Sequence, residues 1–210
     1  HFCFCTLMFV GGISYKIIGA ILGAALPLGG ILIWYIQQPG QILLHDYQLN
    51  RVLSFLNPSD YLLTTYNQQY NSIMAIGSDM LTGKGLDNNT ITSVKGGNFI
   101  SEPQTDFIFA VVGEELGFIG SCVVIGLILL IVIECLRVAK DARDMRGHLV
   151  ASGVAGIITF QAFVNIGVAT GILPNTGLPL PFVSYGLSSL LSNFICIGLV
   201  LNVGLQRNRR

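Results

Sequence analysis

An acidic residue at the start of a long apolar segment is the side chain in this sequence best placed to do chemistry. Asp106 follows Ser101-Glu-Pro-Gln-Thr, in which Ser101 and Gln104 fit a capping box and a proline suits the first turn of a helix. We therefore expect a helix to begin in this segment and to continue into the apolar run. A carboxylate held there can serve as a general acid or base. The alternative is a charge that stabilises the helix N-terminus by a few tenths to about 1 kcal/mol.

Three glycines mark the face of the expected helix that carries Asp106. At 100° per residue, Gly113, Gly117 and Gly120 lie within about 20 to 40° of that face. Glycines let neighbouring helices approach closely, so we expect the carboxylate to point into a helical bundle and not into lipid. Gly113 and Gly117 are accordingly expected to serve helix packing.

A second candidate for chemistry is the lysine of Gly83-Lys84-Gly85. Backbone N–H groups in a glycine turn can face an anion while a lysine neutralises its charge, so Lys84 can contact a phosphate or a glycan. The tripeptide lacks the spacing of a P-loop and the serine or threonine that follows it. A plain turn is the alternative.

These residues belong to a chain that is too apolar for a water-soluble domain. Of 210 residues, 52% are hydrophobic and 10% are charged, whereas soluble domains carry roughly 25% charged residues. Eleven basic residues balance eleven acidic ones, so no surplus of charge indicates a nucleic-acid partner. The five cysteines lie mainly in apolar runs, and none has a histidine at metal-ligand spacing. We interpret them as packing residues and expect no metal site.

Four apolar runs are long enough to cross a bilayer, which takes about 20 residues. We expect transmembrane helices at 16–36, 106–136, 149–173 and 183–205. Residues 1–13 are too short for a span and resemble the remnant of a truncated one. Because the chain begins with His1, we expect it to be the C-terminal part of a longer protein. The predicted fold class is all-α, a polytopic transmembrane helical bundle with about four complete spans and a partial N-terminal one.

The basic residues predict the orientation of this bundle. Eight of the eleven lie at Lys16, in the loop 137–148 or in the tail 206–210, and the positive-inside rule makes these sites cytoplasmic. The segment 37–105 is then a large extracytoplasmic loop, in which we expect short helices. A Pro-rich hairpin at 174–182 lies on the same side. Its irregular backbone must be covered by protein or line a wet cavity.

Polar residues inside the predicted spans are expected to pair with one another or to form a site, because an unpaired charge in a bilayer is costly. Glu114 and Glu115 follow Asp106 by two to three turns, and Glu115 lies about 180° from it around an ideal helix. We interpret both glutamates as structural. Gln161 and Asn165, one turn apart, are expected to donate hydrogen bonds between helices.

Three motifs resemble those of the RodA/FtsW/SpoVE family, also called SEDS proteins. They are Asp106-Phe-Ile-Phe-Ala-Val-Val-Gly-Glu-Glu-Leu-Gly-Phe-Ile-Gly120, Leu173-Pro-Asn-Thr-Gly-Leu-Pro-Leu-Pro-Phe-Val-Ser-Tyr-Gly186, and Tyr66-Asn with the later Gly83-Lys-Gly85. The resemblance spans nearly the whole chain. The Tyr-Asn and Gly-Lys-Gly details are more similar to the RodA branch, which serves elongation, than to the FtsW branch, which serves division.

The resemblance implies a ten-span glycosyltransferase of the bacterial cytoplasmic membrane. Such an enzyme polymerises lipid II into peptidoglycan strands for cell shape or division, together with a class B penicillin-binding protein. Asp106 matches the acid of the family's His-Thr-Asp-Phe motif, which implies a general base that takes the proton of the acceptor sugar hydroxyl. Candidate substrate-binding residues lie in or beside the matched motifs: Lys84, Glu102, Gln104 and Ser184.

Three departures from the family pattern affect the assignment of the family's residue roles to this sequence. Gln104 stands where the family has a histidine, so a proton relay through an imidazole is absent. Leu187 and the pair Asp79-Met80 replace flexible glycines. The family's earlier spans, with the basic residues expected to hold pyrophosphate, have no counterpart in this sequence. The fragment alone is therefore expected to be inactive.

Two other functions compete with the glycosyltransferase. A flippase for lipid-linked precursors is compatible with Gln161, Asn165 and the broken hairpin, but the apolar cores of the spans hold no basic residue for a pyrophosphate. A partner-binding scaffold would use Gly19 and Gly23 as a helix contact. No cofactor is required, and although a divalent cation is compatible with phosphate chemistry, no carboxylate cluster specifies one.

Overall fold

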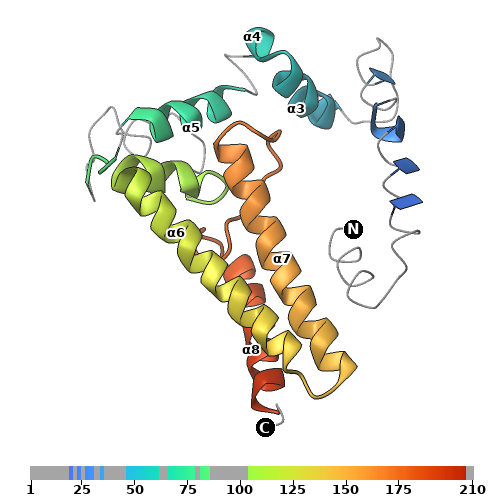
Figure 1. Cartoon of the computed structure of the whole chain (residues 1–210). Coiled ribbons are helices and arrows are strands. Elements are labelled where there is room, and N and C mark those ends of the chain that lie inside the picture. The colour runs from blue at the N-terminus through green and yellow to red at the C-terminus, as the bar shows by residue number, and fades with distance from the viewer. Residues whose placement is uncertain are drawn as a thin grey trace.

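The computed structural model describes residues 46–61, 66–78, 81–85 and 104–206, together with 19–20, 23–24, 27–30 and 34–35. The regular elements of these ranges are α-helices, which confirms the all-α fold class (Figure 1). They are α3 (Asp46–Leu56), α4 (Pro58–Tyr61), α5 (Asn67–Ser78), α6 (Ile108–Lys140), α7 (Met145–Ala169) and α8 (Leu187–Leu205).

Three of these helices, α6, α7 and α8, are long and apolar enough to cross a membrane. They correspond to three of the four predicted spans. Helix α6 extends beyond the expected end at residue 136, and α7 begins and ends about four residues before its expected limits. The fourth predicted span, at 16–36, is described only in short separate stretches, and the remnant at 1–13 lies wholly outside the described residues.

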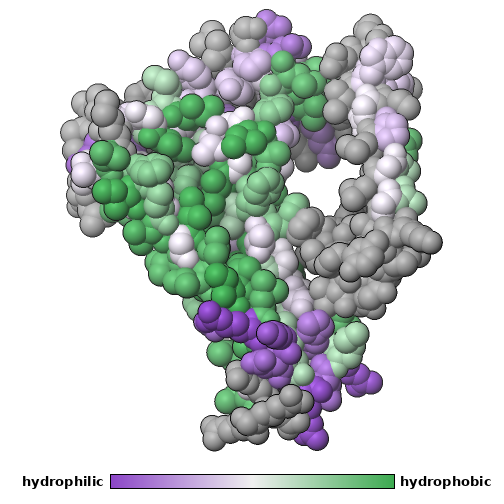
Figure 2. All heavy atoms as spheres, in the orientation of Figure 1, coloured by the Kyte–Doolittle hydropathy of each residue, from purple (hydrophilic) through white to green (hydrophobic). Residues whose placement is uncertain are grey.

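The spanning helices pack through small side chains. Helix α7 runs beside α6 and also contacts α8 (Figure 1). Ala151, Ala155 and Ile158 of α7 are almost completely buried. Small side chains allow close helix approach, which supplies dispersion energy where lipid offers no hydrophobic driving force. Large apolar side chains point outward instead, and Figure 2 shows them covering the helical shafts.

The two ends of the bundle differ in what covers them. Helix α5 packs on α6 and α7 at one end, which we call the loop end. The other end, which we call the turn end, carries the 141–144 connection between α6 and α7. Hydrophilic side chains gather there in Figure 2. The exposed charged residues of this region include Arg137, Lys140, Asp141, Arg143, Asp144 and Arg146.

Helix α6 is broken at Gly117, where φ is 66° and ψ is −162°. Residues 81–85 fill the break. The main-chain N–H groups of Lys84 and Gly85 donate to the carbonyls of Glu114 and Glu115 over 2.9 and 3.0 Å. The N–H of Ile119 donates to a carbonyl of the same segment, over 3.3 Å. The break therefore frees helical hydrogen-bonding groups, and the inserted loop satisfies them.

This geometry corrects two predictions. Helix α6 begins at Ile108 after a turn at 104–107, so it is not continuous with a helix that starts at the predicted capping box. Phe107 is its N-cap and makes no side-chain capping bond. The glycine stripe is also wrong as a single face, because the count of 100° per residue fails at Gly117. Gly113 does mark a close approach, since an added Cβ would lie 3.1 Å from Ile76 Cγ1 of α5.

Candidate active site

The Pro-rich segment after α7 contributes one side of the candidate site. Its main chain is irregular from Gly171 to Gly186. Three residues have positive φ angles, namely 78° at Gly171, 69° at Gly177 and 64° at Phe182. Its prolines supply no N–H group, which prevents a continuous helix. The segment instead folds against the residues that precede α6.

Three consecutive main-chain carbonyls before α6 each accept a hydrogen bond from another part of the chain. Two donors belong to the Pro-rich segment and the third belongs to α7. The N–H of Tyr185 donates to Gln104 O over 2.8 Å, and the hydroxyl of Ser184 donates to Thr105 O over 2.6 Å. The third carbonyl, that of Asp106, accepts from Asn165 Nδ2 over 2.8 Å. We call these three bonds the carbonyl clamp. The clamp fixes the main chain of Asp106 just before α6 begins.

The Asp106 carboxylate faces the tip of the Pro-rich segment. A Cβ added at Gly177 would lie 3.3 Å from Asp106 Oδ2 and 4.0 Å from Arg51 Nη1. Arg51 comes from α3, and its Nη1 also donates to the carbonyl of Asn175 over 3.3 Å. Glycine at 177 thus leaves room for an acid, a guanidinium group and irregular main chain to meet. A guanidinium group can bind an anionic substrate group, and a carboxylate can accept a proton from a hydroxyl.

Lys84 forms an ion pair with Glu114. Its Nζ lies 2.9 Å from Glu114 Oε1, and the glutamate side chain is only 4% exposed. Gly83 and Gly85 adopt positive φ angles of 70° and 86°. The N–H groups of Lys84 and Gly85 face carbonyls of the broken helix, so they are not the anion-facing groups that the glycine turn predicts.

The other predicted site residues take different places. Ser184 is buried, and besides donating in the clamp its hydroxyl accepts from the N–H of Leu180 over 2.7 Å. Gln104 exposes its side chain, and Gln161 and Glu115 are half-buried. Glu102 lies outside the described part of the chain.

Helix α5 anchors the end of α7 beside the clamp. Gln69 Nε2 donates to the carbonyls of Val168 and Leu173 over 2.9 and 2.7 Å. The Ser72 hydroxyl donates to Ala169 O over 2.9 Å. The last carbonyls of a helix have no partner further along it. Ser72 supplies a donor for Ala169 O, and Gln69 adds a second one at Val168 O, which also accepts from the N–H of Gly171 over 3.1 Å.

Sequence reasoning selected Asp106 but missed two residues that face it, Arg51 and Gly177. The available signal was weak. Arg51 is one of three basic residues in the long predicted loop, and Gly177 lies in a segment with three prolines. No local pattern connects position 51 with position 106, because their proximity depends on tertiary folding.

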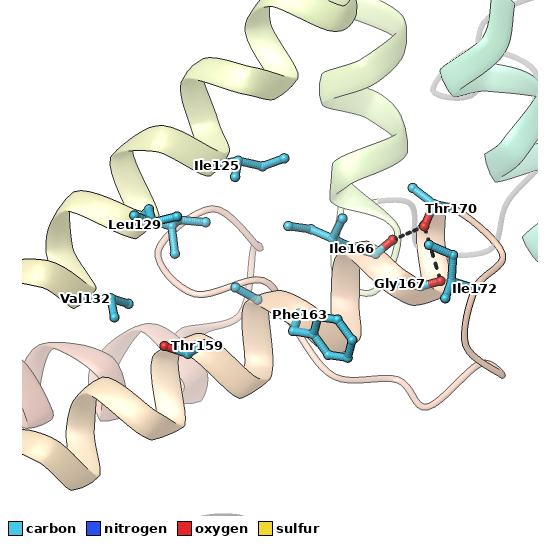
Figure 3. A pocket seen from close by; sticks show the side chains of 11 residues that line it. Ile125, Leu129, Val132, Thr159, Phe163, Ile166, Gly167, Thr170 and Ile172 are labelled. Atoms are coloured by element: carbon cyan, nitrogen blue, oxygen red, sulfur yellow. Dashed lines mark hydrogen bonds between the residues drawn. The ribbon is translucent and has the colours of Figure 1, made fainter.

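A groove of about 370 Å³ lies between α6 and α7 (Figure 3). Ile125, Leu129 and Phe163 are among its lining residues. Two threonines also line it, but the hydroxyls of Thr159 and Thr170 donate to carbonyls of their own helix. The groove is thus suited to hydrocarbon and not to proton transfer. Among the described residues, no three metal-ligating side chains are grouped to hold an ion.

Comparison with known proteins gives consistent matches. The family model FTSW_RODA_SPOVE, described as cell cycle protein, matches residues 1–209. A probable peptidoglycan glycosyltransferase FtsW of Geobacter metallireducens is 37% identical, over 87% of this chain and 52% of that protein. Peptidoglycan glycosyltransferase MrdB of Escherichia coli is 36% identical, over 96% of this chain and 52% of that protein. These nearly equal identities favour no branch of the family.

A solved structure is also similar. It is described as showing structural coordination of polymerization and crosslinking by a peptidoglycan synthase complex. The TM-score is 0.76 at 30% identity, and the match covers 100% of this chain and 55% of that one. The chain spans about half the length of the curated relatives that it matches.

Proposed function

Because this integral membrane chain belongs to the FtsW/RodA/SpoVE family, we propose that it carries the catalytic acid of a peptidoglycan glycosyltransferase. The names of the two relatives support this activity. The substrate is lipid II, which the whole protein polymerises into glycan strands. The observation that carries the proposal is the Asp106 carboxylate, held by the carbonyl clamp and facing Gly177 and Arg51.

Asp106 acts as the general base in this proposal. It removes the proton from the acceptor sugar hydroxyl as that oxygen attacks the anomeric carbon of the donor. The bond between the anomeric carbon and the lipid diphosphate oxygen breaks, and the diphosphate leaves with the electron pair. A main chain fixed by the clamp supports this role, because catalysis depends on holding the reacting groups in a productive geometry.

Arg51 has a complementary role in this proposal. Its guanidinium group lies beside the same glycine as the acid, and guanidinium groups bind phosphate and carboxylate through paired hydrogen bonds. Arg51 thus contacts an anionic group of one of the two sugar substrates while its bond to Asn175 O keeps it at the hairpin. Lys84 is less suited to this duty because it pairs with Glu114.

The orientation and the partner are part of the same proposal. The segments 37–105 and 174–182 lie outside the cytoplasmic membrane, and the charged turn end lies in the cytoplasm. The exposed Arg137, Lys140 and Arg143 near that end support this orientation. A class B penicillin-binding protein is the partner, which agrees with the solved complex described as coordinating polymerization and crosslinking.

The experiment that tests the proposal is lipid II polymerisation in proteoliposomes. It uses the protein translated from the complete gene, with Asp106→Asn as the variant and Glu115→Gln as the matched control. We expect glycan strands from the wild type and the control, and a loss of at least 100-fold for Asp106→Asn. Unchanged polymerisation by Asp106→Asn would contradict the role of general base. Transfer of lipid II between leaflets without polymerisation would favour the flippase.

The 210-residue chain alone provides a second arm of the same assay. The basic residues expected to hold the pyrophosphate belong to a part of the family pattern that this sequence does not contain. We therefore expect no strands from the chain by itself at a protein yield equal to that of the complete product. Strand synthesis by the 210-residue chain would contradict this expectation.

A further inference from the structure

Asn165 of α7 makes two hydrogen bonds that meet at the candidate active site. Its Nδ2 donates to the carbonyl of Asp106 over 2.8 Å and to the carbonyl of Leu178 over 2.7 Å. The side chain is 1% exposed. Both protons of one amide are therefore committed to main-chain groups on either side of the site.

One acceptor belongs to the turn before α6 and the other to the Pro-rich segment, and these two segments face each other at the site. One is the residue that carries the candidate base. The other follows Gly177, whose added Cβ would lie 3.3 Å from the carboxylate of Asp106. A single rigid amide thus links the main chain of the acid to the main chain of the opposite wall. Moving that amide changes the distance between the base and Gly177.

The remaining polar atom of the amide is its oxygen. Asn165 Oδ1 is buried and has no hydrogen-bond partner among the described residues. A buried acceptor without a partner costs free energy, whereas a well-packed apolar side chain of similar shape does not. A residue needed only for packing would not carry this cost. The two donated hydrogen bonds indicate that the amide holds the main chain of Asp106 and that of Leu178 in a fixed relative position.

We propose that Asn165 is a positioning residue that sets the Asp106 carboxylate at its working distance from the hairpin wall. The inference rests on the proposed function and adds a residue that does not touch the substrate. Replacing Asn165 should lower kcat and leave KM nearly unchanged, because the substrate-binding groups remain while the base is displaced. Small displacements of reacting groups cost up to about 100-fold in rate.

Gln69 supplies a matched control at the same end of the bundle. It is also a buried amide, and its Nε2 also donates two hydrogen bonds to main-chain carbonyls, at Val168 and Leu173. Neither acceptor belongs to Asp106 or to the residues next to Gly177. Gln69→Met and Asn165→Leu therefore remove the same number and kind of bonds from different places.

The experiment measures lipid II polymerisation by the complete protein with both variants and with Asp106→Asn. We expect kcat to fall roughly 10- to 100-fold for Asn165→Leu and less than about twofold for Gln69→Met, with KM within about twofold in each. Equal losses in the two variants, or wild-type kcat for Asn165→Leu, would overturn the positioning role. If Asn165→Leu fails to fold, Asn165→Ser and Gln69→Ser are compared by the same criteria.

The Asp106→Asn arm separates this inference from the proposed function. Loss of activity in Asp106→Asn together with a fully active Asn165→Leu rejects the positioning role alone. Full activity in Asp106→Asn rejects the general base, and the positioning role falls with it.

Discussion

The loop end and the turn end of the bundle are held by different interactions. At the loop end, side chains donate to main-chain carbonyls of other elements, and the donors are Arg51, Gln69, Ser72, Asn165 and Ser184. At the turn end, the polar contacts described below join residues no more than nine positions apart in the chain. His148 Nδ1 lies 2.7 Å from Ala139 O across the short turn, and Arg137 pairs with Glu134 within α6.

This difference shows what each end requires. Side-chain bonds to specific carbonyls fix relative positions, which irregular segments cannot fix by helical hydrogen bonding. Where helices pack through alanines and branched apolar residues, a substitution is tolerated if the new side chain has a similar shape and volume. We therefore expect substitutions at the loop end to lower the free energy of unfolding, and chemically similar ones at the turn end or along the shafts to leave it nearly unchanged.

The break in α6 is the point where this contrast should be largest. An alanine at Gly117 would place its Cβ 2.7 Å from Leu81 O and in conflict with the main-chain nitrogen of Gly83. Its φ and ψ angles also lie in a region nearly restricted to glycine, at a cost of roughly 1–3 kcal/mol. Gly117→Ala should sharply lower the thermal unfolding temperature in detergent and abolish polymerisation.

Gly126 of the same helix is the matched control for this substitution. A Cβ added there meets no atom within 4 Å. Alanine is favoured over glycine in a helix by about 1 kcal/mol, so Gly126→Ala should keep or raise the unfolding temperature. Equal temperatures for the two variants would show that the break in α6 is not needed for the fold.

The ion pair beside the break gives a second, smaller effect. Lys84→Met would remove the lysine partner of the Glu114 carboxylate, whose side chain is 4% exposed. Losing one partner of a buried pair costs about 3–5 kcal/mol, and we expect roughly half of that because Lys84 is 23% exposed. Thermal unfolding in detergent measures it, and Lys84→Met/Glu114→Gln should recover part of the loss. No recovery would mean that Lys84 acts through other contacts.

The sequence alone predicts much of the fold and less of the site. Apolar runs of sufficient length predict α6, α7 and α8. A helix that crosses a bilayer needs about 20 consecutive apolar residues, and such a run can be read directly from the sequence. The helix start is mispredicted because the carbonyls before α6 are held by tertiary bonds from Ser184 and Asn165 instead of a local cap.

The residues around Asp106 could not be predicted from the sequence, because their proximity also depends on tertiary contacts. Periodicity treats a helix as continuous, and the break at Gly117 becomes apparent only when residues 81–85 are seen to fill it. The contact of Arg51 with the hairpin joins positions 124 residues apart. Asn165 is predicted to donate between helices, whereas its acceptors are main-chain carbonyls of the turn before α6 and of the Pro-rich segment.

The smallest effect is expected at the turn end, where Arg137→Met removes the basic partner of an ion pair as Lys84→Met does at the break in α6. Arg137 and Glu134 form an ion pair on the surface of α6, with side chains 66% and 61% exposed. Water and salt screen such a pair, which contributes about 0–1 kcal/mol. Arg137→Met should leave the unfolding temperature nearly unchanged, since neither partner is left buried. A loss as large as that of Lys84→Met would show that burial does not explain the difference between the two ends.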